Sequence, residues 1–201
     1  MKETRKGMLL VISGPSGAGK GTLVARLLEK DPSFCFSVSV TTREKRKNEV
    51  NDVHYHFISE AEYDKLLAAD AFLEHAEVHG HRYGTLKQEV YEHLEQGRNV
   101  LLDIDPQGAM AVMEQEKNCV SVFILPPSIR ELRARLNTRN TERPEEIQRR
   151  LHNARGEIAR MNRYRYLIVN DDLELAFDQL TAIVRAEKQN SARYFPVVEE
   201  E

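Results

Sequence analysis

The sequence is poor in cysteine, in long apolar runs and in net charge, and each shortage excludes a class of protein. Its two cysteines, Cys35 and Cys119, stand alone in apolar surroundings, which favours buried thiols over a disulfide or a metal site and fits a reducing compartment. No apolar run approaches the roughly 20 residues of a membrane-spanning helix. A formal charge of −3 provides no overall attraction to nucleic acid or membrane. We therefore expect a cytoplasmic protein that binds neither, whereas its oligomeric state is not predicted.

The 201 residues suffice for one sizeable domain with inserted parts. Short apolar runs typical of buried parallel strands occur at 8–13, 99–105, 120–125 and 166–170. Segments with helical spacing lie between and after them, at 22–30, 128–136, 144–161 and 173–187. This alternation predicts an α/β fold, with a parallel sheet core and helices on both faces. We assign residues 1–36 and 91–190 to this core.

The segment 37–90 has a different character, because its strand candidates are shorter and more polar. They are SVSVTT at 37–42, VHYHFIS at 53–59 and FLEHAEV at 72–78, with a helix at 59–69 that opens on a capping box of Ser59 and Glu62. We interpret this segment as an inserted α+β subdomain. A polar, arginine-bearing stretch at about 137–147 predicts a small mobile lid, and residues 191–201 are expected to form a frayed C-terminal tail.

The first chemical motif is GPSGAGKGT, which runs from Gly14 to Thr22. It nearly fits the phosphate-loop pattern G-x-x-x-x-G-K-[ST], but Gly21 stands where a hydroxyl residue is expected. In a strand–loop–helix setting, backbone N–H groups of such a loop surround phosphate oxygens and the lysine adds positive charge. We therefore predict a nucleotide phosphate site formed by Gly14, Ser16, Gly17, Ala18, Gly19, Lys20, Gly21 and Thr22.

Two further groups of residues suit the same chemistry. Arg43 and Arg46 follow SVSVTT at a spacing that allows a forked grip on a phosphate, with Tyr55 as a hydroxyl donor; a solvated basic loop is the alternative. Asp103 and Asp105 lie at the carboxyl end of a buried strand, where open parallel sheets bind ligands. Asp105 precedes a proline, so its alternative role is to cap the next helix.

Arginines and histidines provide the remaining candidates. A closing lid in a phosphoryl-transfer enzyme supplies positive groups to the transferring phosphate, and Arg135, Arg139, Arg149 and Arg150 suit that role. The alternative is a basic helix face paired with neighbouring glutamates. The histidines at 54, 56, 75, 79 and 81 lack a secure helical spacing for a metal site, and we interpret them as exposed strand and loop residues.

Taken in order, the motifs closely resemble those of guanylate kinases over about residues 8–187. They are GPSGAGKGT, SVSVTTREKR, HYHF, FLEHAEVHGHRYGT, LLDIDPQGA, FILPPS, LRARLNTRNTE, IQRRL and VNDDL. The resemblance implies a P-loop NTPase fold with a GMP-binding insertion and a lid. It also implies ATP-dependent phosphorylation of GMP and dGMP to GDP and dGDP, assisted by Mg²⁺.

The resemblance further implies roles for single residues. The guanine would be surrounded by Ser39, Glu74, Thr85 and Asp105, with Glu74 accepting from the N1–H and the N2 amine, and the GMP phosphate would be held by Arg43, Arg46, Tyr55 and Tyr83. ATP would be bound by the glycine loop with Arg135, and by Asn170 near the adenine. The catalytic set would be Lys20, Arg43, Arg139, Arg150 and Asp103. Magnesium would be held through water and phosphate oxygens, with Thr22 and Asp103 as candidate ligands.

Two departures from the family pattern stand out. EKRKNE at 44–49 replaces a proline-rich turn and forms a less rigid linker, and Gly21 replaces the usual serine. A non-catalytic interaction module of the same fold is one alternative, but the intact loop with Lys20 argues against it. A kinase for another phosphorylated sugar or nucleotide is a second, and the presence of Glu74 with Asp105 argues for guanine instead.

Overall fold

The computed structural model describes residues 3–78, 80–138 and 144–197. Its centre is a five-stranded, all-parallel sheet in the order β10-β9-β2-β8-β3. The strands are β2 (Leu9–Ser13), β3 (Phe34–Phe36), β8 (Asn99–Asp103), β9 (Val120–Leu125) and β10 (Tyr166–Val169). The predicted parallel α/β core is confirmed, and each predicted apolar run forms a strand. Strand β3 was not predicted, because three residues are too short to display a periodicity.

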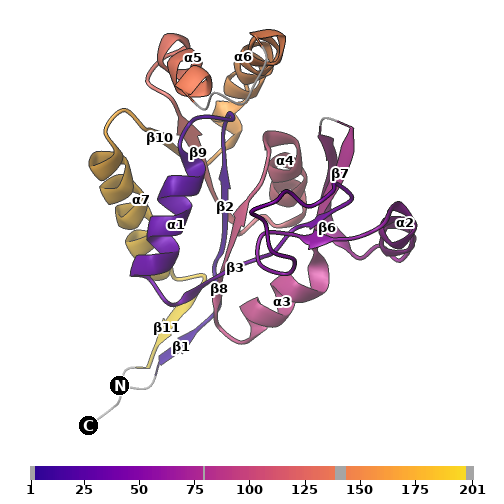
Figure 1. Cartoon of the computed structure of the whole chain (residues 1–201). Coiled ribbons are helices and arrows are strands. Elements are labelled where there is room, and N and C mark those ends of the chain that lie inside the picture. The colour runs from indigo at the N-terminus through magenta and orange to yellow at the C-terminus, as the bar shows by residue number, and fades with distance from the viewer. Residues whose placement is uncertain (1–2, 79, 139–143, 198–201) are drawn as a thin grey trace.

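Helices cover both faces of this sheet (Figure 1). The helices α1 (Lys20–Lys30) and α7 (Leu173–Lys188) lie on one face, while α3 (Lys87–Glu95) and α4 (Pro106–Gln115) lie on the other. Successive side chains of a strand point to opposite faces, so Leu10 and Ile12 of β2 enter the first core and Leu9 and Val11 enter the second. This alternation of apolar side chains explains why the central strand is apolar throughout.

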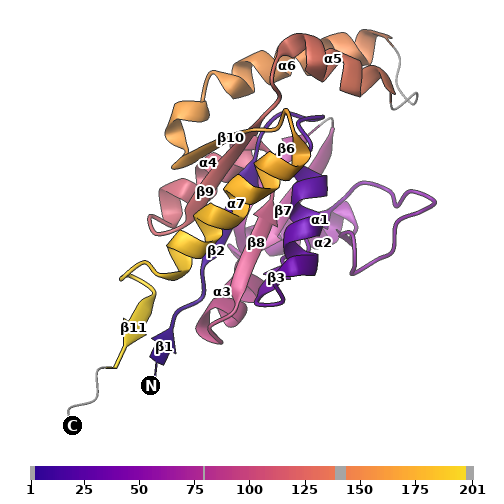
Figure 2. The same cartoon turned by 90° about the vertical axis from the view of Figure 1, so that its left-hand side faces the viewer.

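A second, four-stranded sheet lies within the segment 37–90, in the order β5-β4-β7-β6. Its elements are β4 (Val40–Thr41), β5 (His56–Phe57), α2 (Glu60–Ala68), β6 (Phe72–Val78) and β7 (His81–Leu86). The capping box at Ser59 is present, since its side chain accepts from the Glu62 backbone while Glu62 accepts from the Ser59 backbone. The strands expected at 37–42 and 53–59 shrink to two residues each. The charged chain between them carries no apolar alternation, and it forms a long loop that extends from the body (Figure 2).

The helices α5 (Ile129–Thr138) and α6 (Pro144–Ile158) form a layer of their own beyond the carboxyl edge of the sheet (Figures 1 and 2). They pack on each other through a small apolar cluster of Leu132, Leu136, Leu151 and Ala154. The helix expected to reach residue 161 ends at Ile158, before a 3₁₀ turn at Met161–Arg163. Residues 139–143, the middle of the predicted lid, lie outside the described residues, and Arg139 lies there with them.

The C-terminal segment contradicts the expectation of a frayed tail. Strand β11 (Tyr194–Pro196) pairs antiparallel with β1 (Glu3–Arg5). The turn before β11 is anchored by Arg193, which is 6% exposed, forms an ion pair with Glu187 and donates to the Asn118 carbonyl oxygen. The Asn118 carbonyl is 75 residues away from Arg193 in the chain, so no local pattern revealed this anchor. No helix among the described residues is long and apolar enough to cross a membrane.

Candidate functional site

The glycine loop connects β2 to α1 at the carboxyl edge of the parallel sheet (Figure 1). Gly14 and Gly19 adopt φ values of 141° and 92°, which side chains other than glycine rarely accept. A Cβ atom on Gly14 would also lie 2.2 Å from the carbonyl oxygen of Ile124, so only glycine lets the loop lie against β9. The Lys20 ammonium donates to the carbonyl oxygens of Gly14 at 2.6 Å and Pro15 at 3.3 Å. The amine is thus held against the inside of a loop that precedes a helix N-terminus, the arrangement of an anion site.

Two predicted nucleotide ligands support this loop from behind. The Asn170 side chain is buried, and its Nδ2 donates to the carbonyl oxygen of Ala18 at 2.8 Å. Arg135 donates from Nη2 to the Asn170 carbonyl oxygen at 3.1 Å and from Nε to Glu131 at 3.1 Å. Both side chains therefore brace the loop and its neighbouring strand. The predicted contact of Asn170 with an adenine stays a prediction.

A cavity of about 630 Å³ extends from the loop to the end of β8. Its lining residues are Gly14, Ser16, Gly17, Gly19, Lys20, Gly21, Thr22, Tyr55, Asp103, Ile104, Asp105, Pro106 and Glu157. Asp103 lies in this cavity because β8 ends there, at the same edge as the loop. Burial raises the pKa of the Asp103 carboxyl, and the nearby charge of Lys20 opposes that rise. A carboxyl group and an ammonium group are thus brought to one cavity from residues far apart in the sequence.

A second cavity of about 340 Å³ adjoins the first. Its lining residues are Ser16, Ser39, Tyr55, Glu74, Tyr83, Asp103, Ile104, Asp105 and Arg150. The two cavities share Ser16, Tyr55, Asp103, Ile104 and Asp105. Most of the residues predicted around the guanine therefore meet in one place, next to the phosphate loop. Thr85 is buried behind Glu74, and it belongs to the wall rather than to the lining.

Glu74 is the most unusual acid of the second cavity, because its side chain is only 5% exposed. It lies opposite Thr85 in the β6–β7 ladder, just after a register irregularity at Phe72, and Thr85 Oγ1 donates to Glu74 Oε1 at 2.7 Å. Burial raises the pKa of Glu74 to about 7, opposed by the Thr85 hydrogen bond and assisted by the negative charge of Asp105. The surrounding protein groups therefore stabilise an ionised Glu74 only in part, and a ligand with N–H donors would add to that stabilisation.

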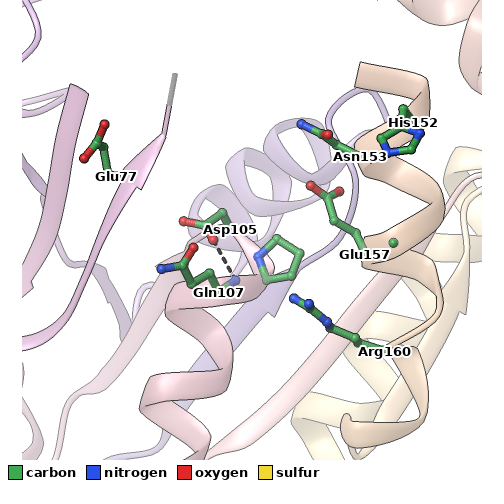
Figure 3. Close-up of a pocket in the computed structure, with 9 residues that line it drawn as sticks. Glu77, Asp105, Gln107, His152, Asn153, Glu157 and Arg160 are labelled. Carbon is green, nitrogen blue, oxygen red and sulfur yellow. Dashed lines mark hydrogen bonds between the residues drawn. The ribbon is translucent and has the colours of Figure 1, made fainter. Parts of the chain in front are cut away.

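Asp105 caps the N-terminus of α4, which is the alternative role that the sequence allowed for it. Its Oδ1 accepts from the backbone N–H of Gln107 at 2.6 Å (Figure 3). The same oxygen accepts from the backbone N–H of Gly108 at 3.2 Å. It also lines both cavities. The cap holds this carboxylate in one orientation, so helix capping and a place in the site are compatible.

Arg43 and Arg46, the two predicted phosphate-binding arginines, differ in their contacts and exposure. Arg43 lies over the Tyr55 ring, 5.4 Å from its centroid, and binds Glu49 through both Nη atoms, at 3.0 and 2.8 Å. The hydrogen bond to Glu49 is also the main reason that the pKa of Arg43 is raised, with a smaller contribution from a hydrogen bond to Tyr83. Arg46 is exposed, and neither Arg43 nor Arg46 lines either cavity. Sequence reasoning missed Glu49, whose only signal was one acidic residue at the end of a basic run.

The helix α6 brings two more charged groups to the site. Arg150 lines the second cavity and donates from Nη1 to Ser16 Oγ in the glycine loop at 3.1 Å. Glu157 was not predicted; burial raises its pKa and the charge of Lys20 opposes the rise. It also borders a third cavity of about 380 Å³, where Figure 3 shows Glu157 and Arg160 on one side and Glu77 on the other. Nothing in the local pattern of α6 distinguishes Glu157 from its exposed neighbours.

Two adjoining cavities, one walled by a phosphate loop and the other by a buried carboxylate, suit a reaction between two bound nucleotides. Comparison with known proteins agrees with this geometry. The family model described as guanylate kinase matches residues 6–187. A guanylate kinase of Rhizobium johnstonii is 51% identical over 185 residues, covering 92% of this chain and 84% of the relative. A guanylate kinase of Carboxydothermus hydrogenoformans is 48% identical over 188 residues, covering 94% of this chain and 92% of the relative.

A solved structure leads to the same family. The crystal structure of guanylate kinase from Anaplasma phagocytophilum matches with a TM-score of 0.80 at 36% identity, covering 96% of this chain and 92% of that one. Both the predicted family and the predicted P-loop fold are thereby confirmed. The chain belongs to the guanylate kinase family, enzymes that transfer a phosphoryl group from ATP to GMP.

Proposed function

We propose that the chain phosphorylates GMP and dGMP in the second cavity, with ATP phosphates on the glycine loop and Mg²⁺ as the assisting ion. The observation that carries this assignment is the buried, Thr85-bonded carboxylate of Glu74 in a cavity that adjoins the phosphate loop. Purine nucleotide metabolism in the cytoplasm is the setting that we expect for such an enzyme.

Selectivity for guanine follows from the chemistry of Glu74 and Asp105. A guanine presents an N1–H and an N2 amine on one edge, and both are donors that a carboxylate accepts. Adenine has an unprotonated N1 and no N2 amine, so it would leave the buried Glu74 carboxylate with no new donor besides Thr85. A site built to bond a donor strongly rejects an analogue that lacks it, because its own buried polar groups are then unpaired. Ser39 and Thr85 complete this proposed guanine site.

The GMP phosphate would be bound near Arg43, Tyr55 and Tyr83, which lie together beside the second cavity. The two Nη atoms of Arg43 hold a carboxylate of Glu49 in a forked geometry. Arginine binds phosphate with the same fork, so the substrate phosphate would share or replace the Glu49 contact. Arg46 would join only after the exposed loop moves toward the cavity.

Transfer itself requires alignment and charge neutralisation more than a base. The attacking atom is an oxygen of the GMP phosphate, which is already largely ionised, and the transferring group carries its charge on peripheral oxygens. We expect Lys20 from the loop and Arg150 from α6 to neutralise that charge, with Arg139 as a further proposed contributor. Closure of the α5–α6 layer would exclude water that otherwise hydrolyses ATP.

Magnesium suits the residues present. Mg²⁺ prefers oxygen ligands and binds through one or two carboxylates, waters and substrate phosphates. Asp103 and Thr22 offer such oxygens in the cavity of the glycine loop, and a cation there would offset the burial that raises the pKa of Asp103. We propose that these two residues hold the ion through water and phosphate oxygens. When bound, the ion would neutralise negative charge on the ATP phosphates.

A coupled assay tests the proposal, with ATP, Mg²⁺ and in turn GMP, dGMP, IMP, AMP, CMP and UMP. We expect turnover with GMP and dGMP, weaker use of IMP because it lacks the N2 amine, and little turnover with the other three. Absence of turnover with GMP would contradict the assigned reaction. Equal use of AMP and GMP would preserve a kinase but remove Glu74 from its proposed role.

A further inference from the structure

Gly108 touches the carboxylate of Glu74, although the two residues belong to different parts of the fold. It is the third residue of α4 and lies fully inside the protein. A Cβ atom built on it would lie 2.3 Å from Glu74 Oε2 and 3.0 Å from Glu74 Cδ. The first distance is shorter than real Cβ atoms show and the second is unusually tight, so the position of this carboxylate depends on the missing side chain.

The backbones on either side of this contact have little freedom to separate. The Gln115 side chain of α4 donates to the Leu73 carbonyl oxygen of β6 at 2.8 Å, directly before Glu74. At the other end of the helix, Asp105 caps the N–H groups of Gln107 and Gly108. With α4 attached to β6 and its first turn capped, a Cβ at 108 would be accommodated by the free end of the Glu74 side chain.

We infer that Gly108 is a positioning residue for guanine recognition: it leaves the space in which Glu74 holds its carboxylate toward the base. This inference rests on the proposed contact between Glu74 and the guanine. A methyl group at 108 would push Oε2 away by about 1 Å and disturb the Thr85 hydrogen bond, whereas the fold would tolerate the change. Alanine is a better helix former than glycine, so the helix itself would not be weakened.

The experiment is the Gly108→Ala variant, with Gly156→Ala as its matched control. Gly156 also lies in a helix, but a Cβ there would have no atom within 4 Å. For Gly108→Ala we expect KM for GMP to rise on the order of 10- to 100-fold, the scale associated with losing a hydrogen bond to a charged group. We expect kcat and KM for ATP to stay within about 2-fold, since the lost contact is made equally in the bound substrate and the transition state. Discrimination between GMP and IMP should fall, and Gly156→Ala should match the wild type.

A double-mutant cycle shows whether Gly108 acts through Glu74. If it does, Gly108→Ala added to Glu74→Ala changes KM for GMP no further, because the displaced group is already gone. A Gly108→Ala enzyme with wild-type KM and discrimination would overturn the inference. So would an equal loss in the Glu74→Ala background, or a loss of stability with unchanged GMP selectivity. If Glu74→Ala alone leaves GMP kinetics unchanged, the proposed guanine contact itself fails, and the inference about Gly108 falls with it.

Discussion

Glu74 makes the stability of the ligand-free protein depend on pH, and Glu74→Gln isolates that dependence. The pKa of Glu74 is about 7 in the folded protein against an ordinary value of 4.5. The folded state therefore binds this proton more tightly than the unfolded state does. Because the unfolded chain loses the proton first, ionisation of Glu74 lowers the free energy of unfolding as pH rises from about 4.5 to about 7, and the loss is complete above that range.

The size of the effect follows from the pKa difference, at about 1.36 kcal/mol per pH unit. The full loss is about 3 kcal/mol, and about 2.5 kcal/mol of it develops between pH 5 and pH 8. The glutamine variant cannot ionise, yet it keeps an oxygen that accepts from Thr85. We therefore compare the free energy of unfolding of Glu74→Gln with that of the wild type. We expect this difference to favour the variant by about 2.5 kcal/mol more at pH 8 than at pH 5.

Urea unfolding of both ligand-free proteins at pH 5 and pH 8 measures this quantity. All other titrating groups are common to the two proteins, so their contributions cancel in the difference. A difference that is the same at both pH values would refute the assignment of a raised pKa to Glu74. A wild type that gains stability relative to the variant at pH 8 would refute its sign.

The same ionisation controls substrate capture. The dependence of kcat/KM on pH reports groups of the free enzyme. For the wild type, kcat/KM for GMP should fall about tenfold per pH unit below pH 7, because a protonated Glu74 offers one acceptor fewer to the guanine. The Glu74→Gln enzyme should lack this limb, keep only the ionisation of the GMP phosphate and discriminate less between GMP and IMP. Identical profiles for the two enzymes would separate Glu74 from guanine binding.

Three further outcomes are expected. Lys20→Ala should lower kcat at least about 100-fold, the scale for removing one group that stabilises transition-state charge, without shifting the urea midpoint; full activity would contradict the role of the phosphate loop. Gly21→Ser adds a hydroxyl where the structure leaves open space, and it should lower the Mg²⁺ concentration for half-maximal rate; an unchanged Mg²⁺ dependence would indicate that Thr22 or water already supplies that oxygen. Arg193→Met removes the closer of the two ion pairs of the buried Glu187 and leaves the longer one, to Arg165 at 3.9 Å, so the free energy of unfolding should fall by about 3 kcal/mol; urea unfolding measures it, and an unchanged value would show that the anchor is dispensable.

Local patterns predicted the core of the fold well. The apolar runs, the glycine loop and the Ser59 capping box each act over a few residues, so the strands, α1 and α2 were readable from the chain. The β1–β11 pair was not, and the prediction of a frayed tail was wrong for residues 194–196. The turn before β11 is held by the contacts of Arg193 with Glu187 and with the Asn118 carbonyl oxygen. No periodic pattern in the sequence indicates either contact.

The sequence alone determined the family, the parallel α/β core and the residue types of a nucleotide site, because motif spacing and hydrophobic alternation are properties of the chain. Only the tertiary structure decided how these residues are used. It engaged Asn170 with the loop, paired Arg43 with Glu49, and set Gly108 against Glu74. The physical reason is that burial, pKa and close approach are set only after the sheet, its helices and its loops have packed, and no periodic pattern in the chain records them.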